Sequence, residues 1–327
     1  MIETRGLRKS YTVGKGGKAK TVDAVRGVDL DVGKAEIFGF LGPNGAGKTT
    51  TLRMLSTLIT PDGGQATVAG VDLLSRPGEV RRRIGYVAQG GGTTDEVSAR
   101  EELVLQARMY GIGKAEAQRR AVTALETFQL TEYADRKCNT YSGGQRRRVD
   151  IAMGVIHEPQ VLFLDEPTTG LDPQSRARLW EEVRRLRDSG MTVFLTTHYL
   201  DEADALCDRL AIIDHGEIVA EGTPSALKHE IAGDVVTVGI GTDNPEEAGA
   251  DEENAAKAAE LLEATDYVRR LERSGTSLRL YVDDGATAIA QILRTLDGAT
   301  ITFGKMELNR PSLDDVFLIK TGRSLRE

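Results

Sequence analysis

Residues 42–49 have types and a spacing suited to binding the phosphates of a nucleotide. Three glycines in this segment permit backbone angles closed to other residues, so consecutive N–H groups can turn toward phosphate oxygens at the positive end of a helix. The strand-like run 37–41 and the helix-forming run 50–58 provide the context that such a loop requires. We therefore predict that a nucleoside triphosphate is bound here by Gly42, Pro43, Asn44, Gly45, Ala46, Gly47, Lys48, Thr49 and Thr50.

Two side chains at the end of this loop are suited to act on the phosphates directly. Lys48 supplies a positive charge that would lie against the β and γ phosphates. The hydroxyl of Thr49 would complete the coordination of Mg²⁺, a hard cation that prefers oxygen ligands. The loop therefore predicts a nucleotide site that also uses a divalent metal.

A pair of carboxylates, Asp165 and Glu166, follows the continuous apolar run 161–164, which is typical of a strand buried on both faces of a parallel sheet. Carboxylates at the carboxyl end of such a strand face the ligand crevice. We predict that Asp165 holds the metal through its water shell and that Glu166 polarises the attacking water. Beside the phosphate loop, this pair indicates hydrolysis of the bound nucleotide.

A second motif for anion binding lies just before the acidic strand. Ser142, Gly143 and Gly144 precede a helix expected to begin near Gln145, and the helix terminus would suit a γ phosphate presented by a second subunit. With Tyr141 where leucine is usual, this pattern resembles the signature of the ATP-binding cassette (ABC) ATPases. Residues 1–230 are similar to that family throughout.

The resemblance implies that the nucleotide is ATP, with Mg²⁺, and gives roles to four further residues. Gln89 matches the glutamine that contacts metal and water and links the core to the helical subdomain. Asp172 matches the family's D-loop aspartate at the nucleotide, and His198 the histidine that contacts the γ phosphate. Tyr11 resembles the aromatic residue that stacks on adenine. In this reading Glu166, His198 and Gln89 are catalytic.

The pattern over residues 1–230 alternates apolar strand-like runs with helical stretches, which indicates an α/β fold with a P-loop NTPase core on a mainly parallel sheet. Between Gln89 and Tyr141, apolar residues recur every three to four positions without a convincing strand. We therefore predict an inserted helical subdomain at about residues 90–149.

Residues 231–327 predict a small α+β accessory domain. A composition break at Asn244 opens an acidic, alanine-rich stretch, and a capping box of Ser312 and Asp315 should begin the last helix. The order of elements suits a ferredoxin-like split βαβ unit. We expect strands at 234–240, 267–272, 277–282 and 300–306, with helices at 254–265 and 286–296 and a terminal helix.

Composition excludes several classes of protein. A net charge of −8, from 42 basic and 50 acidic residues, argues against wholesale nucleic-acid binding, and the basic run 146–148 is expected to form a solvated helix face. No apolar run approaches the roughly 20 residues of a membrane span, and the N-terminal residues lack a secretory signal, so we expect a cytoplasmic protein. Cys138 and Cys207 should be reduced packing residues.

The sequence thus predicts the ATP-hydrolysing subunit of an ABC transporter. The resemblance implies a homodimer or paired cassettes arranged head to tail beneath a transmembrane permease on a separate chain, without nucleic acid. The runs 145–150 and 309–318 resemble the daunorubicin-resistance type of drug-exporting ABC ATPases, which implies export of an amphipathic compound and an accessory domain that modulates the ATPase.

Two other functions use the same motifs. A soluble ABC protein of translation or DNA repair usually carries two cassettes or a long coiled-coil insertion, whereas this chain has one cassette and a short helical insertion. A non-catalytic, nucleotide-sensing regulator would not need the complete set of Lys48, Asp165, Glu166 and His198.

Overall fold

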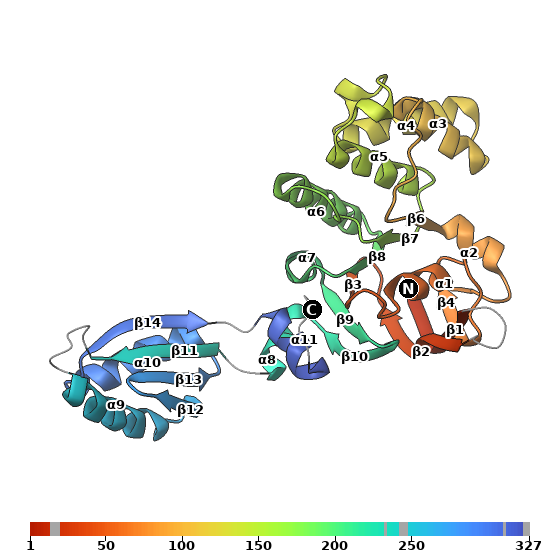
Figure 1. Ribbon diagram of the computed structural model, residues 1–327. Helices are drawn as coiled ribbons and strands as arrows, with labels where there is room; N and C mark the ends of the chain where they lie inside the picture. The colour runs from red at the N-terminus through yellow and green to blue at the C-terminus, as the bar shows by residue number, and fades with distance from the viewer. Residues whose placement is uncertain (14–19, 232–233, 242–247, 310–311, 323–327) are drawn as a thin grey trace. The chain divides into compact units, whose positions relative to one another are not determined.

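The computed structural model describes residues 1–13, 20–231, 234–241, 248–309 and 312–322, and the composition break at Asn244 lies outside them. The chain divides into two units, Met1–Thr223 and a second that begins at Pro224 (Figure 1). This division falls before the boundary expected at residue 230, because helix α8 (Pro224–Ile231) packs against the terminal helix α11 (Leu313–Thr321). In the described part of the chain, no helix has both the length and the apolarity needed to cross a membrane.

The N-terminal unit contains ten strands and seven α-helices among its described residues. Its strands are β1 (Ile2–Val13), β2 (Lys20–Val32), β3 (Ile37–Leu41), β4 (Gly63–Val68), β5 (Val71–Asp72), β6 (Ile84–Val87), β7 (Val161–Asp165), β8 (Thr192–Thr197), β9 (Arg209–Asp214) and β10 (Glu217–Gly222). Its helices are α1 (Lys48–Leu55), α2 (Pro77–Arg83), α3 (Ala99–Met109), α4 (Lys114–Thr127), α5 (Gly143–Val155), α6 (Pro173–Asp188) and α7 (Leu200–Leu206).

A six-stranded sheet in the order β10-β9-β3-β8-β7-β6 carries the phosphate loop and the acidic pair. All of its strands run parallel except β10, which confirms the predicted mainly parallel sheet. Every residue of β3, β7 and β8 is buried, as expected for central strands covered on both faces. Because parallel strands end at one edge, β3, β7 and β8 bring their following loops together there.

A second, four-stranded antiparallel sheet in the order β2-β1-β4-β5 packs against the first. The core between them contains an aromatic cluster in which Phe194 contacts Phe38, Phe40 and Phe163, with ring centroids 5.6 to 5.8 Å apart. These rings come from β8, β3 and β7. The cluster therefore locks together the strands whose ends form the site.

Helices α3 and α4, with the first part of α5, form the predicted insertion, and they gather at one end of the N-terminal unit in Figure 1. A capping box begins α3, where the Ser98 hydroxyl accepts from the Glu101 N–H and the Glu101 carboxylate accepts from the Ser98 N–H. Cys138 lies buried within this insertion and Cys207 near β3, and both are free, as predicted.

Helix α5 passes so close to β6 that two glycines meet at the contact. A Cβ built on Gly85 would clash with the carbonyl oxygen of Gly154, and one built on Gly154 would lie 2.8 Å from Val87 Cγ2. No side chain fits at either position. The helix that follows the signature is therefore seated directly on the edge strand of the parallel sheet.

We expect Gly85→Ala to lower the free energy of unfolding by about 1–3 kcal/mol, because the added methyl group forces this contact apart. Urea or thermal denaturation followed by circular dichroism measures the effect. Gly78→Ala in α2 is the control, since its Cβ would approach only the flexible Arg81 side chain, at 3.9 Å. Equal stability of the two variants would contradict the close approach.

The C-terminal unit contains β11 (Asp234–Ile240), α9 (Ala248–Glu263), β12 (Val268–Ser274), β13 (Ser277–Val282), α10 (Gly285–Gly298), β14 (Phe303–Asn309) and α11, in the predicted order. Its strands form an antiparallel sheet in the order β12-β13-β11-β14. Val236, Val238 and Ile240 alternate inward and pack with α9 and α10, which cover one face of this sheet (Figure 1). The capping box of Ser312 and Asp315 begins α11, as predicted.

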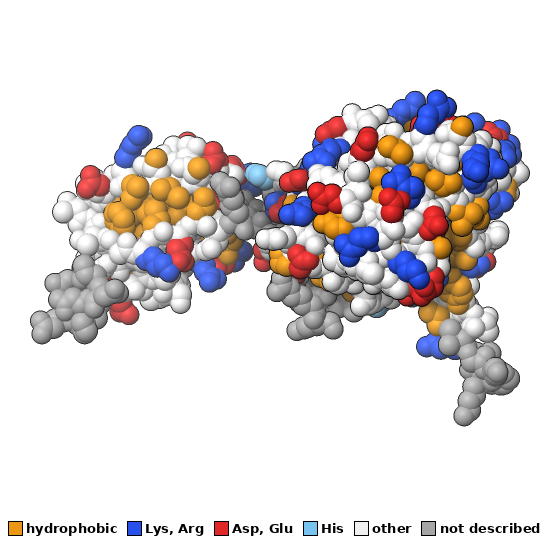
Figure 2. All heavy atoms as spheres, turned by 90° about the horizontal axis from the view of Figure 1, so that it is seen from above, with side chains coloured by type: hydrophobic (Ala, Val, Ile, Leu, Met, Phe, Trp, Pro, Cys, Tyr) orange, Lys and Arg blue, Asp and Glu red, His pale blue; other side chains and the backbone are white. Residues whose placement is uncertain are grey.

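The surface of the N-terminal unit carries charges of both signs. On the face that Figure 2 shows, acidic and basic side chains are interspersed over this unit. The ion pairs of this unit include Arg187 with Asp208 at 2.6 Å and Arg176 with Asp201 at 2.9 Å. This face therefore presents mixed charge rather than a field of one sign.

Candidate active site

The phosphate loop connects the end of β3 at Leu41 to the start of α1 at Lys48. Gly47 caps this helix with a φ of 109°, a conformation that side chains disfavour. At the other end of the loop, a Cβ on Gly42 would clash with the carbonyl oxygen of Ile213. The glycines are thus required by the fold itself, and the N–H groups of the first turn of α1 remain directed out of the helix.

Lys48 is buried in this loop, with 4% of its surface exposed. Its Nζ donates to the carbonyl oxygens of Gly42, at 2.8 Å, and Pro43, at 3.1 Å. The same ammonium lies 3.4 Å from Glu166 Oε1. Burial lowers the pKa of Lys48, while the neighbouring Glu166 carboxylate opposes that shift. The loop therefore holds a desolvated positive charge beside the acidic pair.

Asp165 ends β7 and is 2% exposed. Its Oδ1 accepts a hydrogen bond from the Thr49 hydroxyl, at 3.1 Å, and another from Thr196, at 2.7 Å. The bond from Thr49 joins the phosphate loop to the acidic strand, as the predicted metal site requires. A hydroxyl and a carboxylate side by side provide oxygen donors that fit Mg²⁺.

Glu166 has a φ of 44°, which is uncommon for a residue with a side chain and is often found at functional sites. Its N–H donates to the Thr196 carbonyl oxygen, at 3.1 Å, and this holds the backbone in place. Its Oε2 accepts from Gln89 Nε2 at 2.9 Å and lies 3.1 Å from His198 Nδ1. The structure thus brings the three predicted catalytic side chains together, next to Lys48.

The signature begins α5 at Gly143, two residues earlier than expected, with Ser142 as its N-cap. The Ser142 hydroxyl accepts from the Gln145 N–H at 3.2 Å, and the Gln145 side chain accepts from the Ser142 N–H at 2.8 Å. Tyr141 is buried, and its hydroxyl donates to the carbonyl of Tyr133. Burial raises the pKa of Tyr141 to about 12, so the phenol stays protonated. Tyrosine therefore packs behind the signature with its polar atom satisfied.

Asp172 is the N-cap of α6, where its carboxylate accepts from the Ser175 N–H at 2.9 Å and from the Ser175 hydroxyl at 2.7 Å. These bonds lower the pKa of Asp172. A Cβ on Gly144 would lie 2.6 Å from Ser175 Oγ. The signature and the D-loop are therefore adjacent within one chain, and the contact with nucleotide predicted for Asp172 stays a prediction.

Tyr11 lies on β1 opposite Val22, with 39% of its surface exposed. The Lys9 ammonium lies 5.9 Å above its ring. An exposed ring on a strand is accessible to a flat ligand. Its stacking on adenine stays a prediction.

Sequence reasoning missed three residues that organise the site. Thr196 bonds both Asp165 and the Glu166 N–H, and a threonine at the end of the neighbouring parallel strand was a signal for this. The expectation that residues 146–148 form a solvated helix face is wrong for Arg147, which is 6% exposed, and Asp150 is also buried. Their spacing with Ile151 and Gly154, also buried, is that of one inward helical face.

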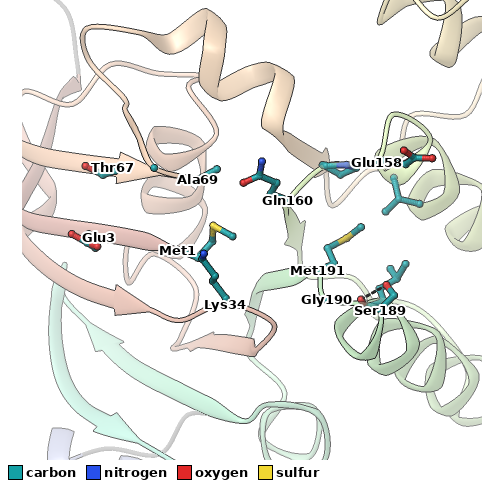
Figure 3. Close-up of a pocket in the computed structure, with 14 residues that line it drawn as sticks. Met1, Glu3, Lys34, Thr67, Ala69, Glu158, Gln160, Ser189, Gly190 and Met191 are labelled. Atoms are coloured by element: carbon teal, nitrogen blue, oxygen red, sulfur yellow. Dashed lines mark hydrogen bonds between the residues drawn. The ribbon is translucent and has the colours of Figure 1, made fainter.

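A cavity of about 790 Å³ lies elsewhere in the N-terminal unit. Figure 3 shows Met1, Glu3 of β1, Thr67 of β4, Lys34, Gln160 and Met191 around it. None of the predicted site residues lines this cavity. It is therefore separate from the candidate active site.

Comparisons with known proteins cover the whole chain. The profile of the ABC transporter family matches residues 25–169, and a profile described as ATP-binding protein DrrA1-3-like, C-terminal domain, matches residues 222–321. The chain is 44% identical to the daunorubicin resistance ATP-binding protein DrrA2 of Streptomyces coeruleorubidus, over 98% of this chain and 95% of that protein. It is 36% identical to the linearmycin resistance ATP-binding protein LnrL of Bacillus subtilis, over the full length of both.

Solved structures match about two thirds of the chain. A dimeric ATP-binding cassette, MJ0796, in a post-hydrolysis state with ADP and Pi aligns with a TM-score of 0.62 and 26% identity, covering 68% of this chain and 98% of that chain. An ATP-binding subunit of an ABC transporter aligns with a TM-score of 0.61 and 29% identity, covering 70% of this chain and 92% of that chain.

Proposed function

Because the chain belongs to the ABC transporter ATP-binding proteins of the DrrA daunorubicin/doxorubicin resistance type, it is an ABC transporter ATPase, and we propose that it works as a head-to-tail dimer beneath a separate permease. The observation that supports hydrolysis at this site is the convergence of Lys48, Gln89 and His198 on the Glu166 carboxylate. Transfer of a phosphoryl group to water needs a cation that binds the phosphates and a group that orients the water. The Lys48 ammonium and the Glu166 carboxylate, which two side chains hold, can supply these.

In the proposed mechanism, Lys48 holds the β and γ phosphates of ATP while the N–H groups of the loop bind their oxygens. Thr49 and Asp165, with Gln89, would hold Mg²⁺, which supplies positive charge against the phosphates. Glu166 orients the attacking water and accepts its proton. The side chains of Gln89 and His198 keep this carboxylate in position.

The head-to-tail dimer would complete each site with the signature of the other subunit. Ser142, Gly143 and Gly144 open a helix whose first N–H groups lack partners in the helix and suit the γ phosphate. The alignment with the dimeric MJ0796 cassette, bound to ADP and Pi, supports pairing of two cassettes. Two equivalent sites at the dimer interface follow from the symmetry.

The cargo is proposed to be an amphipathic, drug-like compound, since relatives of this chain are named for resistance to daunorubicin, doxorubicin and linearmycin. The permease would place the protein on the cytoplasmic face of the membrane. Isolation of the tagged protein from membranes, followed by identification of the chain that co-purifies, tests the class of function. A polytopic partner supports the proposal, and recovery with ribosomes or DNA instead would favour the translation or repair alternative.

For the C-terminal unit, we propose a ferredoxin-like fold that modulates pairing and turnover. The order βαββαβ, with the first strand between the third and fourth in an antiparallel sheet, supports this fold. No phosphate-binding loop occurs in this part of the sequence. The unit is therefore assigned to regulation rather than to catalysis.

We expect a chain truncated near residue 232 to fold and to bind ATP, because the whole candidate site lies in the N-terminal unit. A second truncation at residue 223, where the two units divide, is the matched variant, since it also removes α8. Calorimetric titration with ATP measures binding. Failure of both truncated chains to fold or bind would show that the C-terminal unit belongs to the core.

A further inference from the structure

The Arg147 side chain joins the two loops that carry the proposed catalytic residues. Its guanidinium donates to the carbonyl oxygens of Ala88 at 2.7 Å, Pro167 at 2.8 Å and Asp165 at 3.1 Å. Ala88 directly precedes Gln89, and Asp165 and Pro167 stand on either side of Glu166. One planar cation thus fixes the backbone next to both side chains of the Gln89–Glu166 hydrogen bond.

Asp150, one turn further along α5, holds the other side of the glutamine loop. Its Oδ1 accepts from the N–H groups of Gly92, at 2.7 Å, and Thr93, at 3.1 Å. Arg147 and Asp150, on a single helix, therefore form hydrogen bonds with the backbone before and after Gln89. Both are buried, so these bonds form away from competing water.

Helix α5, which carries both residues, packs closely against the sheet. The glycine contact between Gly154 and Gly85 seats it directly on β6. At its other end stands Ser142, the N-cap of the signature. Arg147 lies five positions after Ser142, a rise of about 7 to 8 Å along the helix.

We infer that Arg147 is a positioning residue for ATP hydrolysis, which sets the backbone on both sides of Glu166 and before Gln89, with Asp150 holding the loop beyond Gln89. This rests on the catalytic roles proposed for Glu166 and Gln89. The positive φ of Glu166 makes such support necessary, because the surrounding structure must maintain an uncommon backbone conformation. The side-chain hydrogen bonds of Arg147 and Asp150 go to the loops around Glu166 and Gln89 and not to the phosphate loop, so the loss of Arg147 should affect hydrolysis more than it affects binding of ATP.

Arg147→Met keeps the unbranched apolar stem of the side chain but removes all three donors. We expect kcat to fall on the order of 10²-fold in the full-length protein, since a displacement of about 1 Å at a catalytic group has effects of this size. The ATP concentration at half-maximal rate should change by less than about threefold, a shift of under ~1 kcal/mol. Arg147→Lys retains the charge but not the three-pronged geometry, and should recover part of the rate.

The matched control is Arg148→Met on the same helix. Arg148 donates to the carbonyl oxygens of Phe128 and Gln129 and does not contact either catalytic loop, so this variant should keep wild-type turnover. Thermal denaturation of all variants shows whether they are folded. If Arg147→Met keeps the wild-type kcat, or if both methionine variants lose rate in proportion to lost stability, Arg147 has no positioning role.

Glu166→Gln, measured alongside, separates this inference from the proposed function. Loss of hydrolysis in Glu166→Gln with normal turnover in Arg147→Met overturns only the role of Arg147. Normal turnover in Glu166→Gln overturns both, because the residue being positioned would then not be catalytic. If Arg147→Met fails to fold, the single variants Arg147→Lys and Asp150→Ala test the inference instead. A wild-type kcat in both of them would overturn it.

Discussion

Glu166→Gln should hydrolyse ATP at least about a hundredfold more slowly than the wild type, because the amide cannot accept the proton of the attacking water. Glutamine keeps the shape of the side chain, and the contacts of Gln89 and Lys48 with the site remain largely available. Binding of two ATP molecules should still close the dimer, while the step that reopens it is lost. The variant should therefore accumulate as an ATP-bound dimer, which size-exclusion chromatography with light scattering detects in ATP and Mg²⁺.

Adding Ser142→Arg to Glu166→Gln is the control for the geometry of pairing. The long cation would fill the N-terminus of α5 that is proposed to receive the partner's phosphate, so the double variant should stay monomeric. A Glu166→Gln protein that hydrolyses ATP at the wild-type rate would remove this residue from catalysis. One that loses hydrolysis but remains monomeric with ATP would argue against stable head-to-tail pairing of the isolated subunit.

Lys48→Ala should abolish hydrolysis and weaken ATP binding by roughly tenfold to a hundredfold, since a charge-assisted hydrogen bond contributes about 1.5–3 kcal/mol. The ammonium lies against two loop carbonyls and the Glu166 carboxylate, and alanine removes this charge from the loop. The fold should persist, because the glycine contacts that shape the loop do not involve this side chain. Calorimetric titration and steady-state hydrolysis measure the two effects.

Lys34→Ala serves as the control for a lysine removed from the same unit, because Lys34 is exposed beside the cavity that lies apart from the site. It should bind and hydrolyse ATP normally. Normal turnover in a folded Lys48→Ala protein would be incompatible with catalysis at this loop.

The residues that the sequence predicted well are those whose chemistry depends on local structure. A phosphate loop is defined by glycines between one strand and one helix, and Gly47 and Lys48 stand where that local pattern requires. Asp165 follows a fully apolar strand, so its place at the edge of the sheet follows from the pattern of burial. The parallel sheet, the helical insertion and the order of elements in the C-terminal unit were predictable for the same reason.

The residues that the sequence did not reveal act through partners distant in the chain. Arg147 stands between two other arginines, and the sequence alone therefore favours exposure to solvent. Its burial depends on the carbonyl groups of Ala88 and Pro167, which only the tertiary fold brings near. The D-loop residue Asp172 is a good helix cap by type, and its closeness to the signature through Ser175 depends on how α5 and α6 pack. Charge type alone therefore predicted solvent exposure where the fold provides a buried set of acceptors.

The hydrogen bonds from α5 to the catalytic loops have a thermodynamic consequence for a dimer with two shared sites. The signature at the start of this helix would meet the nucleotide held by the partner, whereas Arg147 in the same helix holds Glu166 of its own chain. Any preference of Ser142 for a bound γ phosphate is then coupled to the geometry of the other site. Linkage requires this coupling to be reciprocal for binding, so occupancy of either site changes the affinity of the other by the same factor. The two hydrolysis sites would in that case be energetically dependent on each other.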